Sequence, residues 1–251
     1  MGKVIAVVNQ KGGVGKTTSA VSLTAALHAA GARVLLCDFD PQANATSGMG
    51  VDKRNVTHNT YDMLLNEADP EKCVIRTKYG DLIASGADLA GATVELIGEE
   101  RREYKLKSAL DTLRGSYEYI FIDCPPSLEL LTLNALCAAD SILIPVQCEY
   151  YALEGLSDLM ATLRAIKKRL NPTLDIFGVL LTMYDGRTNF SNQVAQEVRR
   201  HFPGKVFANA IPRNVRLAEA PSHGVPVTVY DRASRGAQAY LAVAEEIMRK
   251  G

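Results

Sequence analysis

The sequence predicts an α/β fold with a doubly wound, mostly parallel sheet and helices on both faces. The first observation is a series of continuous apolar runs, rich in Val and Ile, which are typical of parallel strands covered on both sides. The second is that helical patterns separate these runs along almost the whole chain. The third is that no Pro/Gly-rich linker and no repeat divides the chain, so we expect a single domain, residues 1–251.

The predicted elements alternate along the chain. A strand at 4–8 leads through a glycine-rich turn into a helix at 17–30, which Gly31 ends, and a second apolar strand follows at 33–38. Next come a short helix at 60–65, irregular charged chain to 78, a brief strand and turn at 81–86, and a helical pattern at 89–114. Further strands are expected at 119–123, 141–146, 176–183 and around 206–207, and further helices up to about 170, at 191–201 and at 238–249. Right-handed crossovers would bring the carboxyl ends of the parallel strands to one edge of the sheet.

The glycine-rich turn, residues 9–18, reads Asn-Gln-Lys-Gly-Gly-Val-Gly-Lys-Thr-Thr and is called the phosphate loop below. Backbone N–H groups at such a turn, together with the positive end of the helix dipole, bind phosphate oxygens. Lys16 would reach the β- and γ-phosphates, and the Thr17 hydroxyl would lie on Mg²⁺. The loop therefore predicts a sheet of the phosphate-loop (P-loop) NTPase type that uses ATP and Mg²⁺. The expected nucleotide-binding residues in this loop are Lys11, Gly12, Gly13, Val14, Gly15, Lys16, Thr17 and Thr18.

The loop departs from the usual pattern G-x-x-x-x-G-K-[ST] at its start. Gln10 stands where the first glycine should be, and a second lysine, Lys11, follows it. Because Lys16 already occupies the side of the loop that faces its own nucleotide, Lys11 could reach a nucleotide held by a second copy of the chain. The alternative is that Lys11 is a solvated lysine beside an ordinary phosphate site.

Carboxylates follow two of the predicted strands at the edge that carries the phosphate loop. Asp38 ends the strand at 33–38 and Asp40 follows two residues later, and Asp123 ends the strand at 119–123 just before Cys124-Pro125-Pro126. Asp123 fits the Walker B position and would hold Mg²⁺ through a water molecule, since Mg²⁺ usually retains waters. Asp38 is a further candidate for the metal site, and Asp40 could act on the attacking water or merely cap a helix. The small, polar residues 43–50 suit a flexible switch segment.

Five segments together resemble one family. The phosphate loop resembles the deviant Walker A motif of the ParA/MinD group of ATPases, in which the extra lysine acts in trans. The segments 38–42, 122–126, 145–155 and 211–221 are similar to small chromosomal ParA proteins, the ParA/Soj family. The resemblance implies catalytic roles for Lys11, Lys16 and Asp40, with Asp40 orienting the attacking water. It also implies an ATP-dependent homodimer that binds DNA without sequence preference, and a ParB-type partner that stimulates hydrolysis and drives partitioning.

DNA contacts are expected on a basic part of the chain. Residues 185–235 contain eight basic and four acidic side chains, whereas residues 61–103 contain five basic and ten acidic ones. No recognition motif accompanies the basic stretch, which favours contacts with the DNA backbone. The resemblance points to Arg187, Arg213 and Arg216 as DNA-binding residues. The neighbouring Pro212 and Asn214 could contact the adenine edge, the DNA, or both.

The remaining sequence features concern the cellular compartment of the protein and the state of its cysteines. The sequence begins without a signal-peptide pattern, it contains no apolar run long enough to span a membrane, and its five cysteines show no C-x-x-C spacing. We therefore expect reduced core thiols, a cytoplasmic and nucleoid-associated protein, and no membrane partner. The C-terminal residues lack the basic aromatic tail typical of MinD. A second function remains open, namely an ATP-gated adaptor or regulator that positions a non-DNA cargo or controls another protein.

Overall fold

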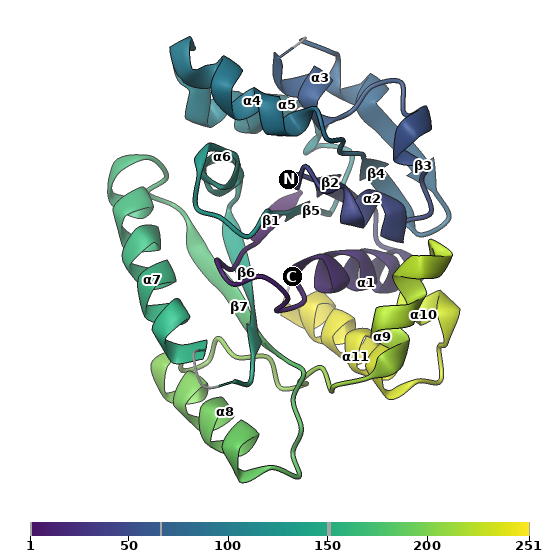
Figure 1. Cartoon of the computed structure of the whole chain (residues 1–251), viewed down its shortest axis with the longest axis vertical. Coiled ribbons are helices and arrows are strands. Elements are labelled where there is room, and N and C mark those ends of the chain that lie inside the picture. The colour runs from purple at the N-terminus through teal and green to yellow at the C-terminus, as the bar shows by residue number, and fades with distance from the viewer. Residues whose placement is uncertain (1, 66, 150–151, 251) are drawn as a thin grey trace.

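The computed structural model describes residues 2–65, 67–149 and 152–250, and it contains one seven-stranded sheet (Figure 1). The strand order is β3-β4-β2-β5-β1-β6-β7, and every neighbouring pair is parallel except β3 with β4. This order confirms the predicted mostly parallel, doubly wound sheet. The strands are β1 (Lys3–Val7), β2 (Val34–Asp38), β3 (Val74–Thr77), β4 (Gly80–Ile83), β5 (Tyr119–Asp123), β6 (Ser141–Gln147) and β7 (Asp175–Thr182).

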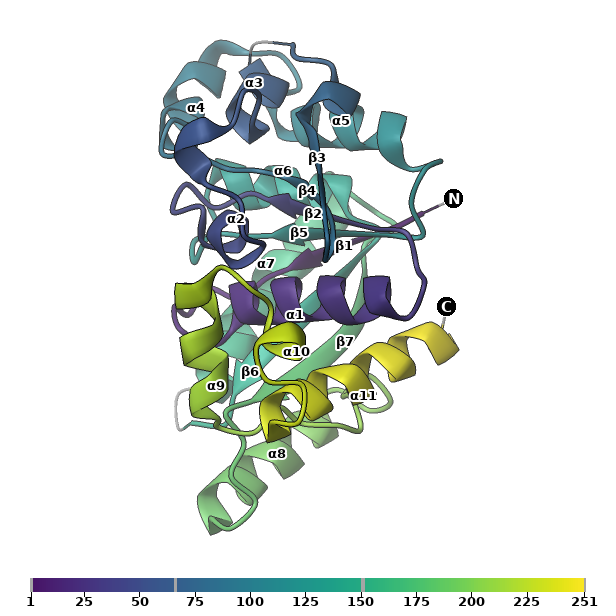
Figure 2. The same cartoon turned by 90° about the vertical axis from the view of Figure 1, so that its right-hand side faces the viewer.

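Helices cover both faces of the sheet (Figures 1 and 2). The helices packed on one face are α3 (Thr60–Leu65), α4 (Leu89–Glu95), α5 (Lys105–Leu113), α6 (Leu130–Ala138), α7 (Ala152–Arg169) and α8 (Asn189–His201). The helices on the other side are α1 (Lys16–Ala29), α2 (Asn44–Gly48), α9 (Val215–Glu219), α10 (Val227–Tyr230) and α11 (Arg235–Lys250).

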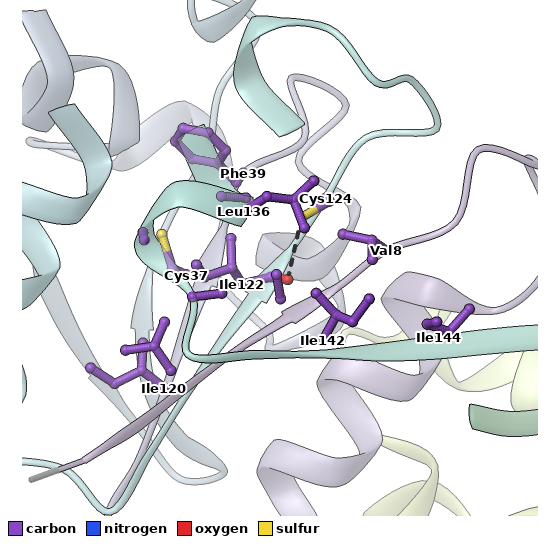
Figure 3. Close-up of a cluster of buried hydrophobic side chains, with 14 of the residues drawn as sticks. Val8, Cys37, Phe39, Ile120, Ile122, Cys124, Leu136, Ile142 and Ile144 are labelled. Atoms are coloured by element: carbon purple, nitrogen blue, oxygen red, sulfur yellow. Dashed lines mark hydrogen bonds between the residues drawn. The ribbon is translucent and has the colours of Figure 1, made fainter. Parts of the chain in front are cut away.

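Alternating strand residues build two separate apolar layers. Val4 and Ile122 point into the layer beneath α3–α8, whereas Ile5 and Phe121 point into the layer beneath α1 and α11. Figure 3 shows part of the first layer, where the Cys124 thiol donates to the Ile122 carbonyl at 3.7 Å. Because the central strands are buried on both faces, their sequences read as unbroken apolar runs rather than as alternating patterns. All five cysteines are buried and free, as expected.

Three predicted elements differ from the structure. The helical pattern at 89–114 is broken into α4 and α5 by 3-10 turns at Leu96–Gly98 and Arg102–Tyr104, because Arg101 adopts a left-handed conformation with a φ of 54°. The irregular chain expected before residue 78 contains the edge strand β3. The strand expected at 206–207 is only an isolated bridge between Val179 and Val206. Helix α6 was not predicted at all.

The strand register brings the predicted site residues to one edge. Asp123 at the end of β5 lies opposite Val7 at the end of β1 and opposite Asp38 at the end of β2. The phosphate loop leaves β1 at this edge, between β5 and β6. No helix among the described residues is long and apolar enough to cross a membrane.

Candidate nucleotide site and basic groove

The phosphate loop presents an uncapped helix start. Gly13 and Gly15 have φ values of 75° and 90°, a region that glycine enters without steric cost. Gly15 is the N-cap of α1 and supplies no side-chain hydrogen bond to the first turn. The loop is held from beneath by the Thr182 hydroxyl, which donates to the Val14 carbonyl at 2.8 Å. The first N–H groups of α1 are therefore available for an anion.

The two loop lysines occupy different environments. Lys16 is 7% exposed, and its ammonium donates to the Lys11 carbonyl at 3.2 Å. Burial lowers the pKa of Lys16, and the nearby Asp123, Cys124 and Asp40 partly oppose that shift. The Lys11 side chain is 38% exposed and forms an ion pair with Glu149 at 3.1 Å. One lysine is thus fixed inside the loop, whereas the other lies at its surface.

Asp123 is the most unusual polar group of the site. It is completely buried, and neither carboxylate oxygen accepts a hydrogen bond of ordinary geometry from a described residue. Burial and the neighbouring Asp38 raise the pKa of Asp123 well above its usual range, while the Thr17 hydroxyl and Lys16 pull it down. A buried carboxylate without partners is costly on its own, so this position suits a cation with its bound water.

Asp38, by contrast, already has three donors. Its Oδ2 accepts from the Thr46 N–H and the Thr46 hydroxyl, both at 2.7 Å, and its Oδ1 accepts from the Asp40 N–H at 3.2 Å. The Thr46 hydroxyl in turn accepts from the Ser85 N–H at 3.0 Å. Burial nevertheless raises the pKa of Asp38 to about 6. These contacts give Asp38 a role in holding the segment that follows it, and its assignment to the metal site stays a prediction.

Asp40 and the segment after it are more ordered than expected. Asp40 is 8% exposed, and its Oδ1 accepts from the Gln42 N–H at 3.0 Å. Residues 43–50, expected to be flexible, instead contain the short helix α2, which starts after Ala43 in a left-handed conformation with a φ of 53°. The helix is ordered because Asp38 holds Thr46, a tertiary contact that the local composition cannot reveal.

We expect the nucleotide-free protein to be more stable near pH 5 than at pH 7.5. The folded-state pKa values of Asp38 and Asp123 lie above the unfolded value of 3.8, so the folded state binds more protons in this range and loses stability as the pH rises through 6. For Asp38 alone the loss between pH 5 and 7.5 is about 1.4 kcal/mol. Urea unfolding at several pH values measures it. Asp38→Asn should flatten the profile, and Asp158→Asn, at an exposed site, should not. A profile that rises steadily from pH 5 to 7.5 contradicts the prediction.

Glu149 is a further site residue, two residues after the end of β6. Besides its ion pair with Lys11, it lies 3.9 Å from the Arg213 guanidinium and accepts a hydrogen bond from Gln147. It therefore joins the phosphate loop to the segment near residue 213. The adjacent Tyr150 and Tyr151, which belong to one of the family-like segments, lie outside the described residues.

A cavity of about 380 Å³ adjoins the phosphate loop. Pro212 and Asn214 line it together with Gly15 and Thr18. Asn214 also caps α9, because its side-chain oxygen accepts from the Arg216 N–H at 3.0 Å. Its amide N–H group faces no acceptor among the hydrogen bonds of the described residues. A mostly apolar cavity with one amide beside a phosphate site has the character of an adenine pocket.

A second hollow, of about 560 Å³, lies next to this cavity and is called the basic groove. Its lining includes three arginines, Arg187, Arg213 and Arg235, of which Arg235 was not among the predicted DNA contacts. Arg187 is 90% exposed and pairs with Asp185, whose pKa is lowered to about 2 mainly by this hydrogen-bonded arginine. Arg216 lies apart on α9, where it pairs with Glu219 and Asp231. Arg235 lies at the start of α11, far along the chain from Arg187. Its position in the groove could be predicted only if the path of the chain back to this edge of the sheet were known.

The predicted Mg²⁺ site can be compared with the side chains that could coordinate a metal ion. No group of three or more His, Cys, Asp or Glu side chains suited to a metal ion occurs in the described parts of the chain. A site built from one hydroxyl, one carboxylate acting through water, and phosphate oxygens is what Mg²⁺ needs, because it keeps several waters. Thr17 and Asp123 fit such a site.

Comparisons with known proteins agree with this geometry. Residues 2–176 match the family described as "AAA domain". The chain is 55% identical to the sporulation initiation inhibitor protein Soj of Bacillus subtilis, with 100% of both chains covered. It is 51% identical to the chromosome partitioning protein ParA of Myxococcus xanthus, covering 100% of this chain and 89% of that protein.

Solved structures show the same fold. Cobyrinic acid a,c-diamide synthase from Mycobacterium smegmatis, solved with an ATP analogue and magnesium, is 39% identical, covers 99% of this chain and 95% of its own, and superposes with a TM-score of 0.89. The cell division ATPase MinD of Pyrococcus furiosus is 27% identical, with 100% of both chains covered and a TM-score of 0.82. The chain belongs to the ParA/Soj family of chromosome-partitioning ATPases.

Proposed function

We propose that this chain, acting as a single domain, is a Mg²⁺-dependent ATPase that dimerises with ATP, binds DNA without sequence preference, and partitions a chromosome or plasmid. A ParB-type partner would stimulate its hydrolysis. The observation that carries the proposal is the contrast between the two loop lysines. Lys16 is buried against its own loop, whereas the Lys11 side chain is partly exposed and forms an ion pair with Glu149. Such a pair is worth little in water, so Lys11 can leave it for a stronger anion.

The nucleotide would lie along the phosphate loop with its base in the cavity lined by Pro212 and Asn214. The N–H groups at the start of α1 and the Lys16 ammonium would bind the phosphates, and Thr17 and Asp123 would hold the metal ion. When bound, Mg²⁺ neutralises phosphate charge as the terminal phosphate leaves. The lack of a hydrogen bond of ordinary geometry from the described residues to Asp123 supports this assignment, because the buried carboxylate gains a counter-charge.

Asp40 would act on the attacking water. It is almost buried at the end of β2, and a single backbone N–H binds one of its oxygens. The other oxygen has no hydrogen bond among the contacts of the described residues, so it can accept one from a water molecule. Orientation of that water by Asp40 would prepare it for attack on the terminal phosphate.

Lys11 would complete the site of a second copy. Closing a dimer face to face brings two triphosphates toward each other, which repel strongly where water is scarce. A lysine donated by each partner offsets this repulsion and stabilises charge that develops during hydrolysis. Exchange of Glu149 for a partner's phosphate would then link dimerisation to ATP.

The DNA face would comprise the basic groove and Arg216. Its exposed arginines suit phosphate contacts rather than base readout, and the hydroxyl of Tyr184, which also lines the groove, is bonded to Asn192. The groove shares Pro212 and Arg213 with the adenine cavity, so nucleotide and DNA would meet on one segment.

We expect Arg187→Ala to weaken ATP-dependent DNA binding at least fivefold and to reduce the slope of log affinity against log salt by roughly 1, because one phosphate contact is lost. Retention on nonspecific duplex DNA at several salt concentrations measures both. Arg54→Ala is a matched control, since Arg54 is 85% exposed and pairs with an aspartate two residues earlier, as Arg187 does. Equal effects of the two variants would show that the groove has no special role.

The same experiment separates the proposal from the alternative. An ATP-gated adaptor or regulator would share the nucleotide site and the dimer, but would bind DNA no better with ATP than with ADP. Wild-type protein that dimerises with ATP and stays off DNA at low salt would therefore favour that second function.

A further inference from the structure

Two glycines bring distant parts of the chain into direct backbone contact. Gly50 follows α2 with a φ of 78°, and Gly224 ends the 3-10 turn Ala220–His223 with a φ of 62°. A methyl group at position 50 would lie 2.8 Å from the Gly224 carbonyl oxygen, and one at position 224 would lie 3.4 Å from the Gly50 Cα. No side chain separates the two backbones, so a shift of one displaces the other directly. We call this contact the glycine joint.

One side of the joint begins at Asp40, to which the proposed function gives the orientation of the attacking water. The Ala43 N–H donates to the Asp40 carbonyl at 2.9 Å, closing the turn that leads into α2. Thr46 within α2 is tied to Asp38, and Gly50 follows one turn later. Because this turn joins Asp40 to the short helix α2, a movement of Asp40 on binding water and phosphate would be passed along the helix.

The other side leads to the adenine pocket and the DNA face. The turn that Gly224 ends continues directly from α9, which carries Arg216 and whose cap is Asn214. The Arg216 guanidinium is fixed by Glu219 at 2.7 Å and by Asp231 at 3.2 Å. Because two carboxylates hold the Arg216 guanidinium, a displacement at Gly224 would move the guanidinium together with the backbone.

A cavity leaves room for this movement. It measures about 430 Å³ and lies between the first turn of α1, α2 and the segment around 217–227. Thr17 and Ser47 line it from the nucleotide side, and Pro221 and Val225 from the other. The hollow therefore separates part of α2 from the 220–227 segment, whereas the two backbones are in contact at the glycine joint.

We propose that the glycine joint sets how strongly ATP controls DNA binding, by transmitting the position of α2 to α9. The inference rests on the proposed function for its DNA readout, but the mechanical link itself concerns only this chain. It assigns to Gly50 and Gly224 a regulatory role without contact with nucleotide or DNA.

The test uses Gly50→Ala, with Gly204→Ala as its matched control. Gly204 has a φ of 72°, and a methyl group there meets nothing within 4 Å, so this variant carries the same backbone strain without the contact. Gly224→Ala is a milder second variant that folds if Gly50→Ala does not. ATP-dependent dimerisation is followed by light scattering, and DNA affinity is compared with ATP and with ADP.

Wild type and Gly204→Ala should bind DNA at least tenfold more tightly with ATP than with ADP. The ratio should fall below threefold in Gly50→Ala and lie between these values in Gly224→Ala, while dimerisation remains normal. A wild-type ratio in both joint variants overturns the inference, and so does loss of dimerisation, because DNA binding would then fail for that reason alone.

Amide hydrogen exchange makes the result independent of DNA. Mg²⁺ and ATP should protect residues 220–230, which do not line the adenine cavity, in wild type and Gly204→Ala but not in Gly50→Ala. Absence of this protection in wild type would refute the proposed role of the glycine joint. If wild type shows protection yet does not bind DNA, the proposed function fails and the joint stands.

Discussion

Lys16→Ala should abolish nucleotide binding, with a loss of affinity of at least 100-fold. The lysine is the buried cation of the phosphate loop, and a charge-assisted contact with phosphate contributes about 3 kcal/mol when water is excluded. Calorimetric titration with Mg²⁺ and ATP measures the loss. Lys107→Ala, which removes an exposed lysine paired within α5, should bind as wild type does. Near-wild-type affinity of Lys16→Ala would remove the basis for the nucleotide site.

Lys11→Ala should bind ATP as a monomer yet fail to dimerise, and hydrolysis should fall at least 100-fold. The loop geometry that holds Lys16 uses the Lys11 backbone carbonyl, not its side chain, so the alanine leaves the phosphate cradle intact. Light scattering with ATP reports the dimer. Glu149→Gln is the complementary variant: it frees Lys11 from its ion pair, and dimerisation should be retained or strengthened.

Mixing two inactive variants distinguishes action within one chain from action across the dimer. Asp40→Ala should bind ATP and dimerise but hydrolyse ATP very slowly, because water orientation is lost. In a mixed dimer with Lys11→Ala, one site combines an intact Asp40 with a Lys11 donated by the partner. Partial recovery of hydrolysis supports action in trans. Normal ATP-dependent dimerisation of Lys11→Ala alone would make Lys11 an ordinary solvated residue.

The sheet and the phosphate loop were predictable because their signals are local. Continuous apolar runs such as 119–123, each followed by a polar turn, mark buried parallel strands, and glycine spacing marks the loop. Helix α6 gave no such signal: it is apolar on nearly every side, so it shows no helical periodicity. The pattern at 89–114 was too long because the left-handed Arg101 breaks a helix that composition favours.

The site was predictable in its members but not in its contacts. The positions of Lys16 and Asp123 follow from strand order, since parallel strands end at one edge. The binding of Thr46 by Asp38 and of Lys11 by Glu149 joins residues far apart in the sequence, and only tertiary structure decides such pairs. The single-domain prediction and the roles of the individual site residues stay predictions for the experiments above.

The strand order also determines when the protein can fold during synthesis. Strand β1 is central in the sheet, but its two neighbours begin only at residues 119 and 141. At about 5–20 residues per second, roughly 5–25 s pass on the ribosome between the completion of β1 and that of β5. Until then β1 has no strand beside it and Lys16 has no Asp123, so ATP cannot stabilise the nascent chain. The phosphate loop is therefore synthesised more than a hundred residues before the strands that complete its surroundings.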